Sequence, residues 1–261
     1  MPGLPTYVER GGEISCRHPA TIKDLRLYGF VIEADRNLLD EFCRRNFNYP
    51  SGGAEQWRAA GNHVVLNFVD IPQLGSADAL DRWLGVVRER EMAIWVPVVD
   101  VRRERVAWAV PYMFVDSGLA MSGGRETYGF PKQLGRLLIP RSDICPDKLA
   151  VSSVTFRRHA PEATATLTQV VRVTCVGPPG TPLGSSWPTP AQAARDLAGL
   201  AVSQHRAPGV SSEPAMVTAA HQSLIDRFRN PQPDGRTILE DTETQCCWSR
   251  ISPQAACLWS S

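Results

Sequence analysis

Apolar and β-branched residues along the first two thirds of the chain, in continuous runs or in alternation with polar residues, predict a series of β-strands. The strongest example is the segment 163–176, in which Thr164, Thr166 and Thr168 alternate with apolar residues, as in an antiparallel strand with one buried face. The charged segment 100–104 separates two of the predicted strands and favours a hairpin turn. The predicted strands are residues 25–34, 63–71, 91–101, 105–115, 137–139, 149–156 and 163–176.

Helical spacing of apolar residues is confined to three segments. Residues 35–47 place Leu38, Leu39, Phe42 and Cys43 on one face, with Asp35 positioned to cap the helix and Cys43 directed to the core. Two further helices are predicted over 190–203 and 213–228, and residues 76–87 form either a short helix or a polar excursion. Many strands followed by helices predict an α+β fold with a barrel or a strongly curved antiparallel sheet.

Two prolines interrupt the predicted strands. Pro97 and Pro111 lie inside the segments 91–101 and 105–115. Proline lacks the backbone N–H that a strand needs for pairing, so we expect an edge, a bulge or a break at each position. The segment 118–135 is rich in glycine and polar residues, and its pattern predicts no regular element.

Length and composition indicate one globular domain over residues 1–261. The polar residues 1–20 are expected to be a mobile lead-in, and the character of the sequence changes after residue 176. The 28 basic and 27 acidic residues leave a net charge of +1, which argues against a nucleic-acid partner. The chain has no long apolar run and no apolar leader, so we expect a cytoplasmic protein without membrane contacts.

The residues that carry chemistry also limit the choice of mechanism. None of the seven cysteines forms a pair with metal-ligand spacing, so we expect reduced thiols and no metal site. Only Lys23, Lys132 and Lys148 are lysines, which leaves few amines that could act as nucleophiles.

Lys132 lies in the densest polar cluster of the chain, Gly-Gly-Arg-Glu-Thr-Tyr-Gly-Phe-Pro-Lys-Gln-Leu-Gly at residues 123–135. The apolar neighbours Phe130, Pro131 and Leu134 favour removal of water, which would lower the pKa of the lysine and supply a neutral amine. The alternative is a surface turn with a solvated lysine.

Segment 111–140 resembles the acetoacetate decarboxylase superfamily. The resemblance is weaker over residues 25–176, and little of the last 80 residues resembles the family clearly. The matching residues, without a gap, are Tyr112, Met113, Asp116, Ala120, Gly124-Arg125-Glu126, Phe130-Pro131-Lys132 and Leu134-Gly135.

The resemblance implies a cone-shaped antiparallel β-barrel with flanking helices, assembled into a homo-oligomer. It also implies that Lys132 forms a Schiff base with a keto acid or small ketone without any cofactor; acetoacetate decarboxylase is itself a standard example of such an activated lysine. Glu126 and Glu91, the latter six residues before Pro97, match family glutamates that would move protons or position the lysine. Glu91 could instead be a solvated charge at a strand end.

Further site residues follow from the same resemblance. Arg125 would orient Glu126 or bind a substrate carboxylate, and Tyr128 and Phe130 would form the walls of the pocket. Gln133 stands where decarboxylases carry a second lysine, and Asn67 stands near a family glutamate, so both are expected beside the substrate. An expected arginine falls near Leu25, one residue from Arg26.

Two functions therefore follow as alternatives. The first is a Schiff-base lyase of the decarboxylase or aldolase-dehydratase type. The second is a non-catalytic or differently catalytic barrel that binds a small hydrophobic carbonyl compound, as the neutral side chains of Gln133 and Asn67 suggest.

Overall fold

The computed structural model describes residues 20–103, 105–141, 146–156, 158 and 160–174, together with the strand segments 186–187, 239–240 and 244–250. The predicted lead-in and the helices predicted over 190–203 and 213–228 lie outside the described residues, apart from Ala20. Within the described part, no helix is both long and apolar enough to cross a membrane.

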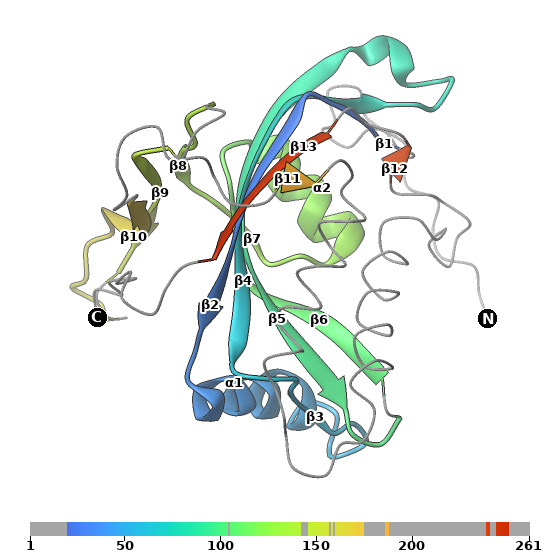
Figure 1. Cartoon of the computed structure of the whole chain (residues 1–261). Helices are drawn as coiled ribbons and strands as arrows, with labels where there is room; N and C mark the ends of the chain where they lie inside the picture. The colour runs from blue at the N-terminus through green and yellow to red at the C-terminus, as the bar shows by residue number, and fades with distance from the viewer. Residues whose placement is uncertain are drawn as a thin grey trace.

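A large curved sheet forms the centre of the molecule (Figure 1). Its four long strands pair with one another in antiparallel fashion, and they confirm the strands and the hairpin that the sequence predicts. These strands are β2 (Leu25–Glu33), β4 (His63–Ser76), β5 (Val86–Asp100) and β6 (Arg105–Val115).

Shorter strands extend the sheet at its edges. Three pairs are parallel, β6 with β7, β2 with β13 and β1 with β12, so the prediction of a purely antiparallel sheet is wrong there. The chain reaches each of these partners through a long connection, which permits parallel pairing. The strand order runs openly from β11 to β7 in the described residues, and a closed barrel stays a prediction. The edge strands are β1 (Ala20–Lys23), β3 (Trp57–Ala59), β7 (Lys132–Leu134), β11 (Ser186–Trp187), β12 (Leu239–Glu240) and β13 (Thr244–Arg250).

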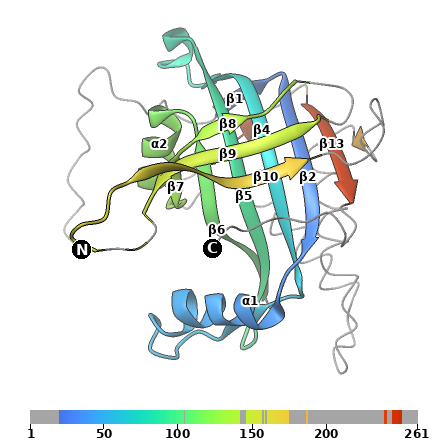
Figure 2. The ribbon, with the colours of Figure 1, turned by 90° about the vertical axis from the view of Figure 1, so that its left-hand side faces the viewer.

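A second, three-stranded sheet crosses one face of the large sheet (Figure 2). It consists of β8 (Arg136–Leu138), β9 (Lys148–Thr155) and β10 (Thr166–Thr174), close to the predicted strands. The main apolar core lies between the two sheets, because every second residue of each long strand faces inward. Its large side chains include Tyr28, Phe30, Phe68, Met92, Phe114, Leu137, Leu149 and Val151.

The strands β4 and β5 extend beyond their predicted ends into a hairpin that projects from the sheet (Figure 1). A single 3₁₀ turn, η2 (Arg82–Leu84), lies near its tip, where a short helix or a polar excursion was expected. Of the outcomes expected at Pro111, the structure shows a bulge, because the pairing of β5 with β6 shifts between Ile94 and Val96 while β6 continues. Pro97 instead stays in the ladder, opposite Trp108.

The first predicted helix is confirmed as α1 (Arg36–Cys43), which continues as a short π-helix, η1 (Arg44–Asn48). The Asp35 side chain caps α1 by accepting from the Asn37 N–H. Cys43 is fully buried, and burial raises the pKa of its thiol to about 12, so it acts as a core residue.

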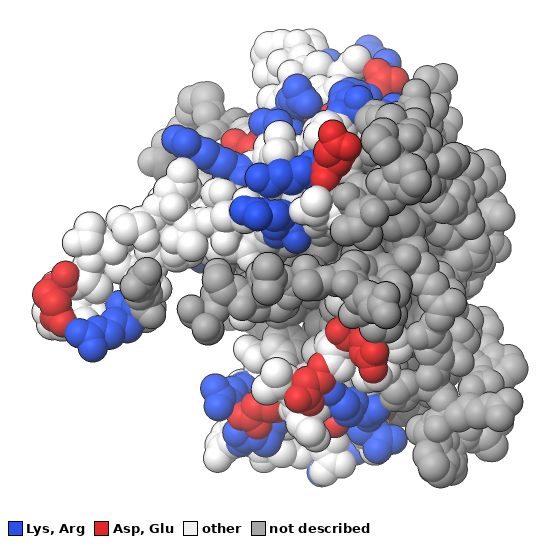
Figure 3. All heavy atoms as spheres, turned by 60° about the vertical axis from the view of Figure 1, so that its left-hand side comes forward, with Lys and Arg blue, Asp and Glu red and all other residues white. Residues whose placement is uncertain are grey.

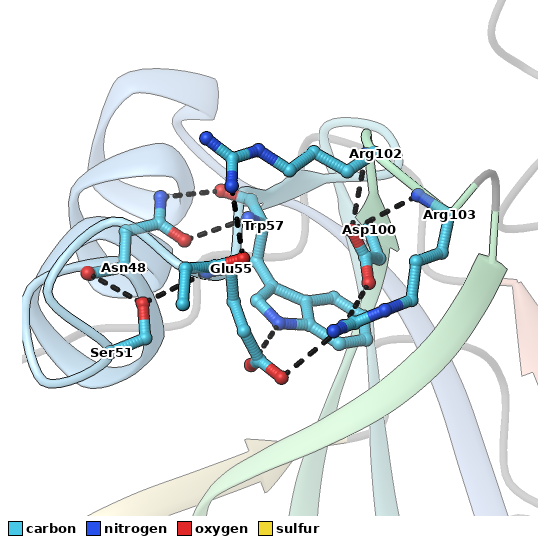
Figure 4. Close-up of polar contacts among 8 residues, drawn as sticks. Asn48, Ser51, Glu55, Trp57, Asp100, Arg102 and Arg103 are labelled. Atoms are coloured by element: carbon cyan, nitrogen blue, oxygen red, sulfur yellow. Dashed lines mark hydrogen bonds and ion pairs between the residues drawn. The ribbon is translucent and has the colours of Figure 1, made fainter.

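Polar contacts join the end of η1 to strand β3, and the loop between them to the β5–β6 turn (Figure 4). The Asn48 side chain donates to the Trp57 carbonyl at 2.9 Å and accepts from the Trp57 N–H at 2.7 Å. Arg103 pairs with the buried Asp100 at 2.9 Å and with Glu55 at 3.3 Å. These contacts hold the lower end of the sheet together.

Helix α2 (Gly118–Tyr128) lies on the face of the large sheet opposite the small sheet (Figure 1). Its glycines obscure it in the sequence, where no regular element was predicted. It forms because β6 and β7 are parallel neighbours, which must be joined by a crossover. Ser117 caps its first turn, and Gly129 ends it in the left-handed conformation, with φ of 69°.

Candidate active site

The register of the sheet brings several of the predicted site residues to one face. Residues paired across neighbouring strands point to the same side of a sheet. Glu91 pairs with Val115 in the row next to that of Lys132. The row of Lys132 runs Asn67–Ala93–Met113–Lys132 across β4, β5, β6 and β7. This face is the one covered by α2, away from the main core.

Lys132 is buried at the start of β7, with 8% of its surface exposed. Of the three lysines in the chain it is the only buried one, since Lys23 is exposed and Lys148 is partly exposed. Its Nζ lies 2.8 Å from Oε1 of Glu89 and 3.2 Å from Oε2 of Glu91. The ammonium group is therefore held between two carboxylates of one strand.

Gly124 of α2 makes room for the lysine side chain. A Cβ at this position would lie 2.4 Å from Cδ and 2.6 Å from Cε of Lys132, far inside contact distance. The chain then turns back at Gly129, and the Phe130 N–H donates to the Gly124 carbonyl at 3.0 Å. The backbone of α2 therefore lies directly against the methylene chain of Lys132 and directs its amine toward β5.

The lowered pKa predicted for Lys132 is wrong in direction. Burial, the largest single influence, does lower the pKa, but the charges of Glu91 and Glu89 outweigh it and leave the pKa raised. The apolar neighbours on which the prediction rested do not enclose the amine, because Pro131 is exposed and Leu134 is half exposed. Gly124 and the sheet remove water instead, and the carboxylates keep the proton on nitrogen.

Glu89 is a site residue that the sequence analysis missed. It is 5% exposed, and burial together with the charge of Glu91 raises its pKa, while Lys132 acts in the opposite direction. Alternation within Arg88-Glu89-Arg90-Glu91 could have identified it, because residues two apart on a strand share a face.

In the Gly-Arg-Glu motif the glycine is buried against Lys132, but the two charged residues that follow it are not. Arg125 and Glu126 are both exposed. Arg125 donates to the backbone carbonyl of Lys132 at 3.3 Å, so it supports the start of β7 rather than the amine. Glu126 follows Gly124 by two residues, about 200° around the helix, and has no hydrogen-bond or ion-pair partner among the described residues. The catalytic role of Glu126 therefore stays a prediction that its position does not support.

Three aromatic rings form a row between the end of α2 and strand β5. Tyr128 is four residues after Gly124 and so lies on nearly the same face of α2. Its ring centroid is 6.3 Å from that of Phe130, which in turn is 6.3 Å from that of Trp95 on β5. Tyr128 and Phe130, predicted as pocket walls, thus belong to a row of three rings that includes Trp95.

The three departures from the family pattern occupy different places. Gln133 is exposed and follows Lys132 in β7, so its side chain leaves from the opposite side of the strand. Asn67 lies in the row of Lys132, but its Oδ1 accepts from the Ala93 N–H at 3.1 Å. Arg26 pairs in unshifted register with Asp70, so it points to the opposite face, as its one-residue offset predicts.

Arg26 belongs instead to a row of alternating charges at the upper end of the sheet. The row runs Arg26–Asp70–Arg90–Asp116 across the strands β2, β4 and β5 to the residue after β6. Arg90 binds Asp116 at 2.6 Å, and the buried Asp70 also pairs with Arg88 at 2.8 Å and with Arg141 at 3.5 Å. Figure 3 shows basic side chains gathered over the upper part of the face nearer the small sheet, with acidic side chains among them.

Within the described segments, no group of three or more His, Cys, Asp or Glu side chains could hold a metal ion. The space between Glu89 and Glu91 is taken by the Lys132 ammonium. Among the described residues, the site therefore places one amine between two carboxylates.

Comparisons with solved structures give low identities. An acetoacetate decarboxylase from Legionella pneumophila is 15% identical, with a TM-score of 0.40 over 67% of this chain and 71% of that chain. The enduracididine biosynthesis enzyme MppR, complexed with pyruvate, is 17% identical, with a TM-score of 0.38 over 64% and 57%. An acetoacetate decarboxylase-like enzyme from Sphingomonas wittichii RW1 is 16% identical, with a TM-score of 0.38 over 66% and 65%.

The family is decided by a different comparison. No curated protein gives a significant match. The model of the family described as acetoacetate decarboxylase (ADC) matches residues 58–192, just over half of the chain. The match includes β4, β5, β6, α2 and β7, the elements that surround Lys132. The chain belongs to the acetoacetate decarboxylase family.

Proposed function

We propose that the protein is a lyase that forms a Schiff base between Lys132 and a ketone or keto acid. The observation that carries this proposal is the burial of a single lysine amine within 3.2 Å of two carboxylates on the strand β5. An ammonium group is costly to bury, and a surface lysine of no chemical use would stay in water. Family membership supports the same reading.

The chemistry begins when the ammonium of Lys132 gives up a proton. The amine lone pair then attacks the carbonyl carbon, a C–N bond forms, and the former carbonyl oxygen leaves as water to give an iminium ion. With a β-keto acid, the C–C bond to the carboxylate breaks, CO₂ leaves, and the electron pair forms an enamine. A proton adds to the enamine carbon, and water hydrolyses the new iminium to release the ketone and the free lysine.

An aldolase-dehydratase would follow the same path to the iminium. Loss of a proton from the adjacent carbon gives the enamine, which attacks an aldehyde before water is eliminated. Both reactions need Lys132, with Glu91 beside it, and a pocket bounded by Tyr128 and Phe130. Arg125 would bind a substrate carboxylate only after it leaves its contact with the Lys132 backbone carbonyl.

The decisive experiment is reductive trapping. The purified protein is incubated with pyruvate, acetoacetate or acetone in the presence of sodium cyanoborohydride, and the mass of the intact protein is measured. We expect one adduct per chain, located on Lys132 by peptide mapping. Each probe should give the mass gain of its own reduced imine.

Two lysine variants are the controls. Lys132→Ala should abolish the adduct, whereas Lys148→Ala should keep it, because Lys148 lies in β9 of the small sheet. Equal labelling of Lys23, Lys132 and Lys148 would be ordinary surface chemistry and would contradict the proposal.

A second candidate is a carbonyl-binding protein without catalysis. The raised pKa of Lys132 favours it, because a protonated amine can donate a hydrogen bond to a carbonyl oxygen but cannot attack the carbonyl carbon. In that case calorimetry would detect binding of a small ketone, and trapping would give no adduct.

A further inference from the structure

Glu89 is the best placed proton acceptor for Lys132. A mechanism that starts from an ammonium needs a base within hydrogen-bond distance, and the base must return the proton when water leaves. We propose that Glu89 takes the Nζ proton of Lys132 and later delivers it to the departing hydroxyl group. This inference rests on the proposed Schiff-base function and assigns one of its steps.

The geometry distinguishes Glu89 from its neighbour Glu91. Nζ donates a hydrogen bond to Oε1 of Glu89 at 2.8 Å, whereas Oε2 of Glu91 lies farther away, at 3.2 Å. The Glu89 side chain is 6% exposed and that of Glu91 is 16% exposed. A proton moved to Glu89 therefore stays away from solvent, within reach of the newly formed bond.

Charge supports the same assignment. One ammonium and two carboxylates leave a net negative charge in a buried space, which a proton on one carboxylate would remove. Burial and the charge of Glu91 raise the pKa of Glu89, so its conjugate acid is closer in strength to the ammonium than an exposed glutamic acid would be. Glu91 then remains the carboxylate that faces the cation.

The step balances in atoms and charge. Transfer of one proton converts the ammonium and the Glu89 carboxylate into a neutral amine and a neutral carboxylic acid. The amine adds to the carbonyl carbon, and its second proton moves to the former carbonyl oxygen, giving a carbinolamine. The Glu89 acid protonates that hydroxyl, the C–O bond breaks, water leaves, and the site again holds one cation and two carboxylates.

Few other titratable groups face this pair within the described residues. Glu91 lies on the same strand, and Asp116 after β6 raises the pKa of Glu89 through its charge but is bound to Arg90. Arg125 of α2 reaches only the backbone carbonyl of Lys132, and Asn67 of β4 does not titrate. Glu89 and Glu91 are thus the carboxylates in contact with the amine.

The test compares two reactions of the same amine in Glu89→Gln. Acylation of Lys132 by acetic anhydride needs only a neutral amine. Loss of a neighbouring negative charge should lower the pKa of Lys132, so acylation should become faster. Trapping of acetone by cyanoborohydride also needs the dehydration step, and should slow by roughly 10²–10⁴-fold. Both rates are measured by peptide mass spectrometry at the same pH.

Glu91→Gln is the matched control, because it removes an equal charge from the same strand. We expect faster acylation again, with a fall in trapping at least tenfold smaller than in Glu89→Gln. If both reactions speed up in Glu89→Gln, Glu89 only holds the ammonium and the proposal is overturned. A wild-type protein that forms no adduct on Lys132 overturns the Schiff-base function itself, and the assignment of Glu89 with it.

Glu89→Asp keeps the inference testable if the glutamine variant does not fold. Aspartate retains the carboxylate but withdraws it by one methylene group from Nζ. We expect slower trapping at an acylation rate close to that of the wild type, with a circular dichroism spectrum that shows the native fold. Trapping at the wild-type rate would overturn the proposal.

Discussion

At the scale of single residues, the site is an unusual solution to the burial of a charge. Two carboxylates on β5 compensate the removal of the Lys132 ammonium from water, and removing one member of such a buried group typically costs about 3–5 kcal/mol. The same carboxylates raise the pKa of Lys132 and so disfavour the neutral amine, which is the form that can act as a nucleophile. Before the reaction, Lys132 is therefore an ammonium ion paired with carboxylates, and the reaction has to begin with a proton transfer from its Nζ.

The pH dependence of Lys132 follows from its raised pKa. Folded Lys132 keeps its proton above the ordinary lysine value of 10.5, so its ion pairs add to stability at lower pH, and this contribution is lost as the pH rises through the raised value. Acylation of Lys132 should therefore show an inflection at higher pH in the folded protein than in the protein unfolded in urea. Pulse labelling with acetic anhydride across a pH series measures both, and an inflection below the unfolded one would contradict the ion-pair geometry.

At the scale of elements, the pairing of α2 with β7 builds the site. The helix runs over the sheet face because β6 and β7 are parallel, and Gly124 is the point where its backbone meets the side chain of Lys132. A glycine within a helix usually lowers stability. At Gly124 the absence of a Cβ is required, whereas at Gly118 nothing lies within 4 Å of an added Cβ.

Gly124→Ala and Gly118→Ala make a matched pair. The first should displace the lysine side chain, which two ion pairs hold in place, and should lower the free energy of unfolding by about 1–3 kcal/mol, as overpacking does. It should also slow imine trapping on Lys132. Gly118→Ala should leave trapping unchanged. Urea unfolding and trapping on both variants check this, and equal behaviour would show that α2 does not press on Lys132.

At the scale of the whole molecule, the two faces of the large sheet have separate tasks. One face packs against the small sheet and holds the apolar core, and the other carries Lys132 under α2. The row Arg26–Asp70–Arg90–Asp116 lies at the upper end of the core face, where Arg141, in the segment after β8, reaches Asp70 of the large sheet.

Asp70→Asn tests the structural role of that row. Asp70 is fully buried, but its partners Arg88 and Arg141 have side chains about half exposed, so solvent screens part of the interaction. We expect the free energy of unfolding to fall by an amount near the lower end of the range of about 1.5–3 kcal/mol that is typical of hydrogen bonds to charged groups. The melting temperature should fall while trapping on Lys132 persists. Asp24→Asn is the control, because asparagine tolerates the positive φ of that exposed residue.

The homo-oligomer expected from the family resemblance stays a prediction at this scale. A solution mass from light scattering decides it directly.

Much of the fold and part of the site follow from the sequence alone. The apolar, β-branched composition of residues 63–71 marks a strand because such side chains pack well in a buried sheet, and Asp35 marks a helix start because its side chain can accept from a free N–H. The spacing of Gly124, Arg125, Glu126 and Lys132 identifies the family. These features are local, so the order of residues determines them.

Contacts between distant segments were decided only by the tertiary structure. In the sequence, Lys132 has apolar neighbours. In the structure, the register of β5 and the crossover to β7 place its amine beside Glu89 and Glu91, and Glu89 is 43 residues away in the chain. The direction of the lysine pKa therefore could not be derived from neighbours in the sequence, because electrostatic energy depends on distance through space. Helix α2 was hidden for a related reason: its glycines lower local helix propensity, and the parallel pairing of β6 with β7 compensates for that loss.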